Sequence, residues 1–347
     1  MFLAQLISQA IEFKASDLHL STGLPPIIRV NGYLQKLDFA ILQEDELRPL
    51  LIKLMNSEQQ KIFNEFMELD FAIYLENLCR LRVNVFKQAR GISAVFRIIP
   101  NRVPTLEELQ LPPVFKEIAA YSKGLVLITG PTGSGKSTTL AALIDYISKN
   151  HSKHIVTIED PIEFIHQSSH CLIHQREIHR DTRSFKAALH SVLREDPDII
   201  LLGELRCLET IRLALTAAET GHLVFATLHT NSAASTVNRL VDAFPGEEKN
   251  LIRSILSQSL QAIIAQTLLE KKGGGRVAAF EILIANPAIK NLIRENKIAQ
   301  IYSALQTGQR SGMHTLDQYL LKLVENGSIT EETATQAALT PDLLSSC

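Results

Sequence analysis

Hydrophobic residues follow two different periods over the first hundred positions. They recur at helical spacing over residues 3–11 and again over 44–66. Asn31-Gly32 is typical of a hairpin turn, and β-rich stretches occupy residues 18–37, 71–75, 79–91 and 92–100. The pattern predicts a small α+β domain with an antiparallel sheet over residues 1–100.

A cluster of prolines separates this region from the rest of the chain. Proline is poorly tolerated inside regular elements, so residues 101–113 are the predicted linker. Beyond it, residues 114–347 contain short apolar runs that alternate with longer helical segments, as expected for parallel strands buried on both faces. These runs are 124–129, 154–159, 198–203 and 222–229. They predict a second domain of the α/β class.

The chain after Pro245 is predicted to be mainly helical. One stretch, residues 277–284, is typical of a strand. The helical stretches are 249–269, 289–296, 297–308 and 315–327. They predict a helical C-terminal region within the second domain.

The sequence GPTGSGKST matches the phosphate-loop pattern G-x-x-x-x-G-K-[ST] and lies between an apolar run and a helical segment, as the pattern requires. Lys136 is expected to neutralise the β- and γ-phosphates of ATP, and Ser137 to bind Mg²⁺. A structural glycine-rich turn, the alternative, does not explain a lysine and a hydroxyl at this spacing. The predicted nucleotide-binding residues are Gly130, Pro131, Thr132, Gly133, Ser134, Gly135, Lys136, Ser137 and Thr138.

Acidic residues follow two of the predicted strands. Glu204 comes directly after DIILLG, where phosphate-loop enzymes place the carboxylate of the metal shell, so we assign it to Mg²⁺ through water. Glu159, Asp160 and Glu163 lie in the turn after HIVTI, and one of them must orient the attacking water if Glu204 serves the metal. We favour Glu163 as that base, with Glu159 behind it as an electrostatic partner. The alternative is a simple turn that leaves Glu163 exposed.

Two histidines bracket the run LVFATL. His229 stands at its C-terminal end, where ligands bind in open α/β sheets, so its imidazole is a candidate for contact with the γ-phosphate. His222 stands at the other end and is a further candidate for nucleotide contact. For both residues the alternative is a packed or capping histidine.

Arginines are concentrated on the last strands of the first domain. They are Arg80, Arg82, Arg90 and Arg97, and the period of two places Arg80 and Arg82 on one face. In most proteins such a run is a solvated sheet face. A phosphate-loop core can instead receive a guanidinium across a subunit interface, where it stabilises transition-state charge. That alternative requires an oligomer.

Composition and charge exclude several classes of function. Lys plus Arg number 35 against 37 Asp plus Glu, so no global basic field attracts nucleic acid or anionic lipid. The four cysteines are far apart and form no CxxC pair, which argues against a disulfide framework and a structural zinc site and favours a reducing cytosol. No basic segment precedes the first apolar residues, and no apolar run approaches the roughly 18 residues of a membrane span. We expect a soluble chain with no signal peptide, no membrane span and no nucleic-acid partner.

Together these residues resemble the PilT family of type IV pilus retraction ATPases, within the wider secretion-ATPase superfamily. The resemblance runs nearly end to end. It is carried by ASDLHLSTGLPPIIRVNG, GPTGSGKSTTLAAL, TIEDPIEF, REIHRDTRSFKAALHSVLREDPDIILLGELR, LETIRLALTAAETGHLVFATLHT and AIKNLIRE.

The resemblance implies a PAS-like α+β N-terminal domain followed by a RecA-like P-loop ATPase domain, in a hexameric ring with ATP at the subunit interfaces. It also implies roles for four residues. Glu163 would be the catalytic base and Glu204 the metal-shell carboxylate, and Arg82 and Arg97 would approach the γ-phosphate.

The stretch that contains His222 and His229 matches the family's histidine-containing stretch. Family members act at the cytoplasmic face of the inner membrane, where they turn the platform protein at the pilus base so that pilins return to the membrane. The resemblance therefore implies that platform protein as a partner, with a paralogous accessory retraction ATPase as another.

Two positions depart from the family pattern. Cys207 replaces an acidic residue in GELRC, and Lys290 replaces an arginine in AIKNLIRE. Three other functions remain open: a type IV secretion-system ATPase with the same nucleotide site, an ATPase-poor paralogue that bridges a motor to the platform, and a nucleic-acid translocase. Pilus-extension ATPases resemble the chain too, but carry a four-cysteine zinc site that this sequence lacks.

Overall fold

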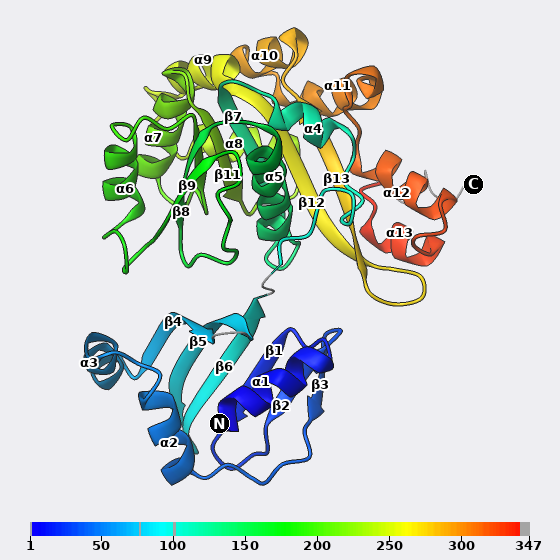
Figure 1. Cartoon of the computed structure of the whole chain (residues 1–347). Helices are drawn as coiled ribbons and strands as arrows, with labels where there is room; N and C mark the ends of the chain where they lie inside the picture. Colours follow the sequence, from blue (N-terminus) through cyan, green and yellow to red (C-terminus); the bar gives the residue numbers. More distant parts are fainter. Residues whose placement is uncertain (1, 76–77, 100–101, 341–347) are drawn as a thin grey trace. The chain divides into compact units, whose positions relative to one another are not determined.

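The chain forms two units, each built around its own β-sheet (Figure 1). The computed structural model describes residues 2–75, 78–99 and 102–340. One unit spans Met1–Arg102 and the other Val103–Cys347. The junction of the predicted first domain and linker, at residues 100–101, and the end of the predicted second domain, at 341–347, lie outside the described residues.

The first unit has an antiparallel sheet in the order β3-β2-β1-β6-β5-β4. The strands are β1 (Asp17–Ser21), β2 (Ile27–Val30), β3 (Tyr33–Lys36), β4 (Glu68–Leu75), β5 (Cys79–Gln88) and β6 (Gly91–Ile99), and the helices are α1 (Phe2–Glu12), α2 (Glu44–Ile52) and α3 (Ser57–Phe66). The predicted helix over 44–66 is thus two helices. The side chain of Asn56 accepts a hydrogen bond from the N–H of Gln59 and so starts α3.

Alternation along β5 separates the core of this unit from its polar sheet face. Leu81, Val83 and Val85 are fully buried in the core. Arg80 and Arg82 project from the opposite face because successive residues of a strand point to opposite sides. The antiparallel sheet predicted for this region is therefore confirmed.

The second unit has a mixed sheet in the order β13-β12-β7-β11-β10-β8-β9. Its neighbours are parallel except for the β12–β13 pair, which is antiparallel. The strands are β7 (Gly124–Thr129), β8 (His154–Glu159), β9 (Leu172–Glu177), β10 (Ile199–Leu202), β11 (Leu223–Leu228), β12 (Leu260–Glu270) and β13 (Arg276–Ile284). The parallel strands predicted from the four apolar runs are confirmed.

Helices cover both faces of this sheet (Figure 1). Leu125 and Leu127 of β7 belong to one core cluster, and Val126 and Ile128 belong to another on the opposite face. Burial on both faces explains why these strands are apolar without alternation. The helices are α4 (Val114–Ala119), α5 (Lys136–Asn150), α6 (Phe185–Val192), α7 (Leu208–Glu219), α8 (Ala233–Asp242), α9 (Lys249–Ser259), α10 (Pro287–Arg294), α11 (Ile301–Thr307), α12 (Leu316–Glu325) and α13 (Glu331–Ala337).

Two strand assignments from the sequence need correction. The predicted helix over 249–269 ends at Ser259, and the apolar residues that follow form β12, which pairs with β7 on one side and β13 on the other. β9 was not predicted at all. Its residues are exposed or partly buried except for Glu177, and four of the six are polar or charged, so it lacks the apolar run that marks its parallel neighbours.

Candidate nucleotide site

The phosphate loop joins the C-terminal end of β7 to the N-terminus of α5. Gly130 has a φ of 143°, and a Cβ at this position would lie 2.1 Å from the main-chain oxygen of Gln266. Gly135, at φ 87°, is the N-cap of α5. These left-handed angles favour glycine, and they turn the chain so that the first N–H groups of α5 face the loop.

Lys136, the first residue of α5, is buried beneath this loop. Its Nζ donates hydrogen bonds to the carbonyl oxygens of Gly130, at 2.8 Å, and Pro131, at 2.9 Å. Burial lowers the pKa of Lys136, and the carboxylates of Glu204 and Glu163 act in the opposite direction. The structure thus brings three of the predicted site residues together at one end of the sheet.

The side chain of Gln266, on β12, forms hydrogen bonds to the phosphate loop and to the helix that follows it. It is buried, and its Nε2 donates to the carbonyl oxygen of Ser134 at 2.7 Å. Its Oε1 accepts from the hydroxyl of Thr139, on α5, at 2.8 Å. One amide therefore ties the loop to its helix and both of them to the neighbouring strand.

Glu204 lies just beyond β10 and has two cationic or titratable neighbours. Arg206 Nε donates to its Oε2 at 2.8 Å, and His229 Nε2 lies 3.2 Å from its Oε1. Arg206 also lies 3.9 Å from a carboxylate oxygen of Asp160. Glu204 and His229 are therefore in contact. This contact is expected, because they follow the C-terminal ends of β10 and β11, which are adjacent and parallel.

Glu159 ends β8 with its carboxylate turned inward. The hydroxyl of Thr157 donates to its Oε1 at 2.6 Å, and Gln175 Nε2 donates to the same atom at 3.2 Å. Burial raises the pKa of Glu159 to about 7, and the nearby carboxylate of Glu163 adds to the rise. A group with this pKa can hold or release a proton near neutral pH.

A small cavity of about 40 Å³ lies beside these groups. A cavity of this size and polarity can hold a water molecule. It is lined by Ser137, Glu159, Glu163, Gly203 and Thr227, among others. The predicted base and the hydroxyl predicted to bind Mg²⁺ therefore line the same cavity.

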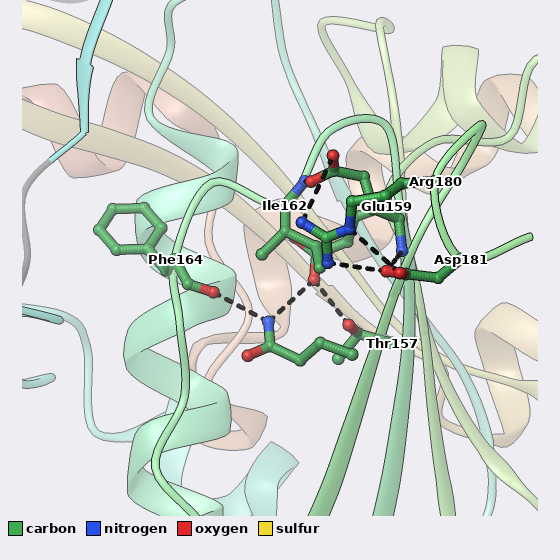
Figure 2. Close-up of polar contacts among 8 residues, drawn as sticks. Thr157, Glu159, Ile162, Phe164, Arg180 and Asp181 are labelled. Carbon is green, nitrogen blue, oxygen red and sulfur yellow. Dashed lines mark hydrogen bonds and ion pairs between the residues drawn. The ribbon is translucent and has the colours of Figure 1, made fainter. Parts of the chain in front are cut away.

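Two side chains of β9, Gln175 and Glu177, form hydrogen bonds to the acidic turn, which is the segment 160–166 that follows β8 and carries Glu163 (Figure 2). Gln175 Nε2 donates to the carbonyl of Phe164 at 2.8 Å as well as to Glu159. A carboxylate oxygen of Glu177 accepts the N–H of Ile162 at 3.1 Å. Figure 2 shows the Phe164 carbonyl and the Glu159 carboxylate converging on the same amide.

The remaining predicted residues lie elsewhere. His222 lies directly before β11, at the end of the sheet opposite the phosphate loop. Its Nδ1 lies 3.0 Å from the carbonyl oxygen of Ala217. Arg82 and Arg97 lie in the first unit, opposite each other on β5 and β6. Arg97 Nε donates to Asp17 at 3.0 Å. The structure does not bring His222 to the phosphate loop of its own chain.

Sequence reasoning missed three residues that shape the site. Arg206 stands two positions after Glu204, and a positive charge this close to the predicted metal-shell carboxylate could have suggested an ion pair. Gln266 follows the apolar stretch AIIA, and a polar residue at such a place points to a buried hydrogen-bonded group. Gln175 gave no signal, because the strand that carries it was not predicted.

Comparisons with known proteins agree with this arrangement. A sequence model of the family described as "Type II/IV secretion system protein" matches residues 1–274. The chain is 57% identical to the Pseudomonas aeruginosa protein described as "Type IV pilus retractation ATPase PilT", over 99% of both chains. It is 56% identical to a twitching motility protein of Neisseria gonorrhoeae, over 92% of this chain and 86% of that one.

A solved structure titled as the pilus retraction motor PilT with bound ADP matches with a TM-score of 0.91 and 46% identity, and covers 99% of both chains. None of the described helices combines the length and the apolar character that a membrane-spanning helix needs. The chain therefore belongs to the type II/IV secretion system protein family and, within it, to the PilT family, with the N-terminal domain and RecA-like ATPase domain that its sequence predicts.

Proposed function

We propose that this chain is a motor that hydrolyses ATP to power the retraction of type IV pili. One observation carries the proposal: Glu163 lines the same cavity as Ser137 of the phosphate loop, and its carboxylate and that of Glu204 both act on the ammonium group of the loop's lysine. This is the composition that phosphoryl transfer requires, since anchoring, metal binding and water activation need separate groups. The chain's 57% identity to a retraction ATPase supports the coupling of this chemistry to pili.

The residues present fit ATP and Mg²⁺. Lys136 and the N–H groups of the phosphate loop would hold the β- and γ-phosphates. Ser137 would bind Mg²⁺ directly and Glu204 through water, since hydroxyl and carboxylate oxygens suit this cation. Bound Mg²⁺ would supply charge neutralisation at the phosphates. Arg206 and His229 fix the orientation of the Glu204 carboxylate.

Glu163 is the residue that we assign to orient and deprotonate the attacking water. It lines the same cavity as Ser137, which supports a position of its carboxylate near the γ-phosphate. Glu159 contributes as an electrostatic partner, because its raised pKa leaves its carboxyl only partly ionised near neutral pH, which lessens the repulsion between the two neighbouring carboxyls. The imidazole of His229 lies on the same side and contacts the γ-phosphate in this proposal.

The active assembly is proposed to be a homo-hexamer at the cytoplasmic face of the inner membrane. Arg82 and Arg97 of one subunit would complete the nucleotide site of the next, because a phosphate-loop core gains transition-state stabilisation from a guanidinium fork. The partner that receives the motion is the platform protein at the pilus base. A paralogous accessory retraction ATPase is a further proposed partner.

Turnover of ATP with Mg²⁺ by the purified chain tests the proposal. Lys136→Ala should lose tight nucleotide binding, whereas Glu163→Gln should bind ATP normally and hydrolyse it at least about a hundredfold more slowly, because only water activation is removed. Binding is measured with a fluorescent ATP analogue and turnover by phosphate release. Equal loss of binding in both variants would contradict the separate roles, and absence of turnover in the unsubstituted chain would contradict the proposed function.

A further inference from the structure

The turn that carries Glu163 is held by side chains rather than by pairing with a strand. His166 donates its main-chain N–H to Gln175 Oε1 at 2.8 Å. Phe164 accepts a hydrogen bond from Gln175 Nε2 at 2.8 Å. The amide of Gln175 therefore closes the C-terminal side of the turn, within one residue of Glu163.

The N-terminal side of the same turn is fixed from the same strand. Glu177 accepts the N–H of Ile162 at 3.1 Å, and both residues are buried. The N–H of Glu177 in turn donates to Asp181 at 2.9 Å, and Arg180 donates to both oxygens of that aspartate. Gln175 and Glu177 stand two positions apart on β9, so their side chains share a face of the strand. Their hydrogen bonds hold the main chain on both sides of Glu163.

The chemistry of position 175 suits only an amide. Its Oε1 must accept from a main-chain N–H, and its Nε2 must donate to a carbonyl and to Glu159 Oε1, at 3.2 Å. A carboxylate could only accept, and an ammonium could only donate. Glutamine thus ties the acidic turn and the Glu159 carboxylate to one side chain of β9.

We propose that Gln175 is a positioning residue for Glu163: it holds the turn that carries this carboxylate at the place where it can orient the attacking water. The proposal rests on the role assigned to Glu163 under the proposed function. A displacement of about 1 Å is enough to cost on the order of a hundredfold in rate, so loss of the amide should be felt in turnover rather than in nucleotide binding.

Two substitutions test this. Gln175→Leu removes all three hydrogen bonds at nearly constant volume, and Gln175→Glu keeps only the acceptor for His166. Both variants should lower kcat at least about tenfold and change the affinity for a fluorescent ATP analogue less than about twofold. Gln261→Leu is the matched control: its Nε2 donates to the carbonyl of Lys123 at the opposite end of β7, and kcat should stay within about twofold.

A double-mutant cycle separates positioning from general stabilisation. In a Glu163→Gln background the loss of Gln175 should change the residual rate less than about twofold, because the group it positions is already absent. An equal loss of rate in both backgrounds, or a loss of analogue binding that matches the loss of kcat, would overturn the proposal. Unchanged kcat in both Gln175 variants would overturn it too.

Failure of the proposed function has a different signature. If the unsubstituted chain does not turn over ATP, or if Glu163→Gln turns it over at the full rate, then Glu163 is not the base. The positioning role of Gln175 is then wrong as well. In the remaining case, Glu163→Gln is inactive while Gln175→Leu is fully active, and only the inference about Gln175 is wrong.

Discussion

At the scale of single residues, Glu159 makes the site sensitive to pH. Its ordinary pKa of 4.5 is raised to about 7 by burial, so the native state binds more protons than the unfolded state between these values. Stability that depends on Glu159 is therefore fully present below pH 4.5, falls as pH rises through this window, and is lost above pH 7.

Glu159→Gln should remove this dependence. Its side chain stays neutral at every pH and can still accept from Thr157. The variant should therefore gain in melting temperature relative to the unsubstituted chain at pH 8 and show no such gain at pH 4. Thermal unfolding followed by circular dichroism at the two pH values measures this, and an identical difference at both would show that folding does not raise the pKa of Glu159.

How far the site could be predicted depends on how local its signals are. Lys136, Glu163 and Glu204 were found because each sits in a short motif that follows a strand. Gln266 and Ser134 are 132 positions apart in the chain, and no spacing rule connects them. Side chains that position a site through long-range contacts carry no local pattern, so they emerge only when the sheet order is known.

At the scale of elements, β12 shows a case in which hydrophobic periodicity predicts the wrong secondary structure. The residues LQAIIAQTLL follow α9 with no glycine or proline between them, so the pattern alone reads as one long helix. They form a strand because β7 and β13 pair with them on both sides and burial covers both faces. Such tertiary pairing overrides local preference, and a single sequence does not reveal it.

α10, which carries the AIKNLIRE sequence, separates a buried face from an exposed one. Ile289 and Ile293 are fully buried, whereas Leu292 is only partly buried. Arg294 is exposed and donates to Asn291 at 2.6 Å. Ile293 is therefore a better probe of the core than Leu292.

Charge reversal at Arg294 should therefore leave ATP turnover within about threefold of normal, since surface substitutions rarely disturb a fold, yet abolish pilus retraction in a piliated host. Ile293→Asp should instead lower stability by about 3 kcal/mol or more by burying an unpaired charge, and both readouts should fail. Phosphate release and twitching assays measure the two effects. If the Arg294 variant lost turnover in proportion to retraction, this helix would belong to the hydrolytic cycle itself.

At the scale of the whole molecule, the proposed composite site requires a ring. Mixing Arg97→Ala chains with Glu163→Gln chains should restore part of the activity, because about one site in four of a randomly mixed ring would combine an intact arginine with an intact base. The matched control mixes Lys136→Ala with Glu163→Gln. Both of these lesions lie in the same half of the composite site, so that mixture should remain inactive.

Mass measurement of the mixed rings must accompany the assay. No recovery with Arg97→Ala in rings shown to be mixed would place the arginine and the base of each site within one chain. Recovery in the control mixture would show instead that Lys136 and Glu163 of one site come from different chains.

The place of β7 in the sheet has a consequence for amide hydrogen exchange. β7 has a strand on each side, and all of its residues are buried, whereas β9 pairs only with β8. Amides of β7 should exchange only when the whole domain opens, and those of β9 through local fluctuations. Deuterium uptake followed by mass spectrometry should therefore slow at β9 and at residues 160–166 when nucleotide is added, whereas β7 should take up little deuterium with or without nucleotide. Motion driven by nucleotide would then begin at the edge strand, with the strand beneath the phosphate loop acting as its fixed base.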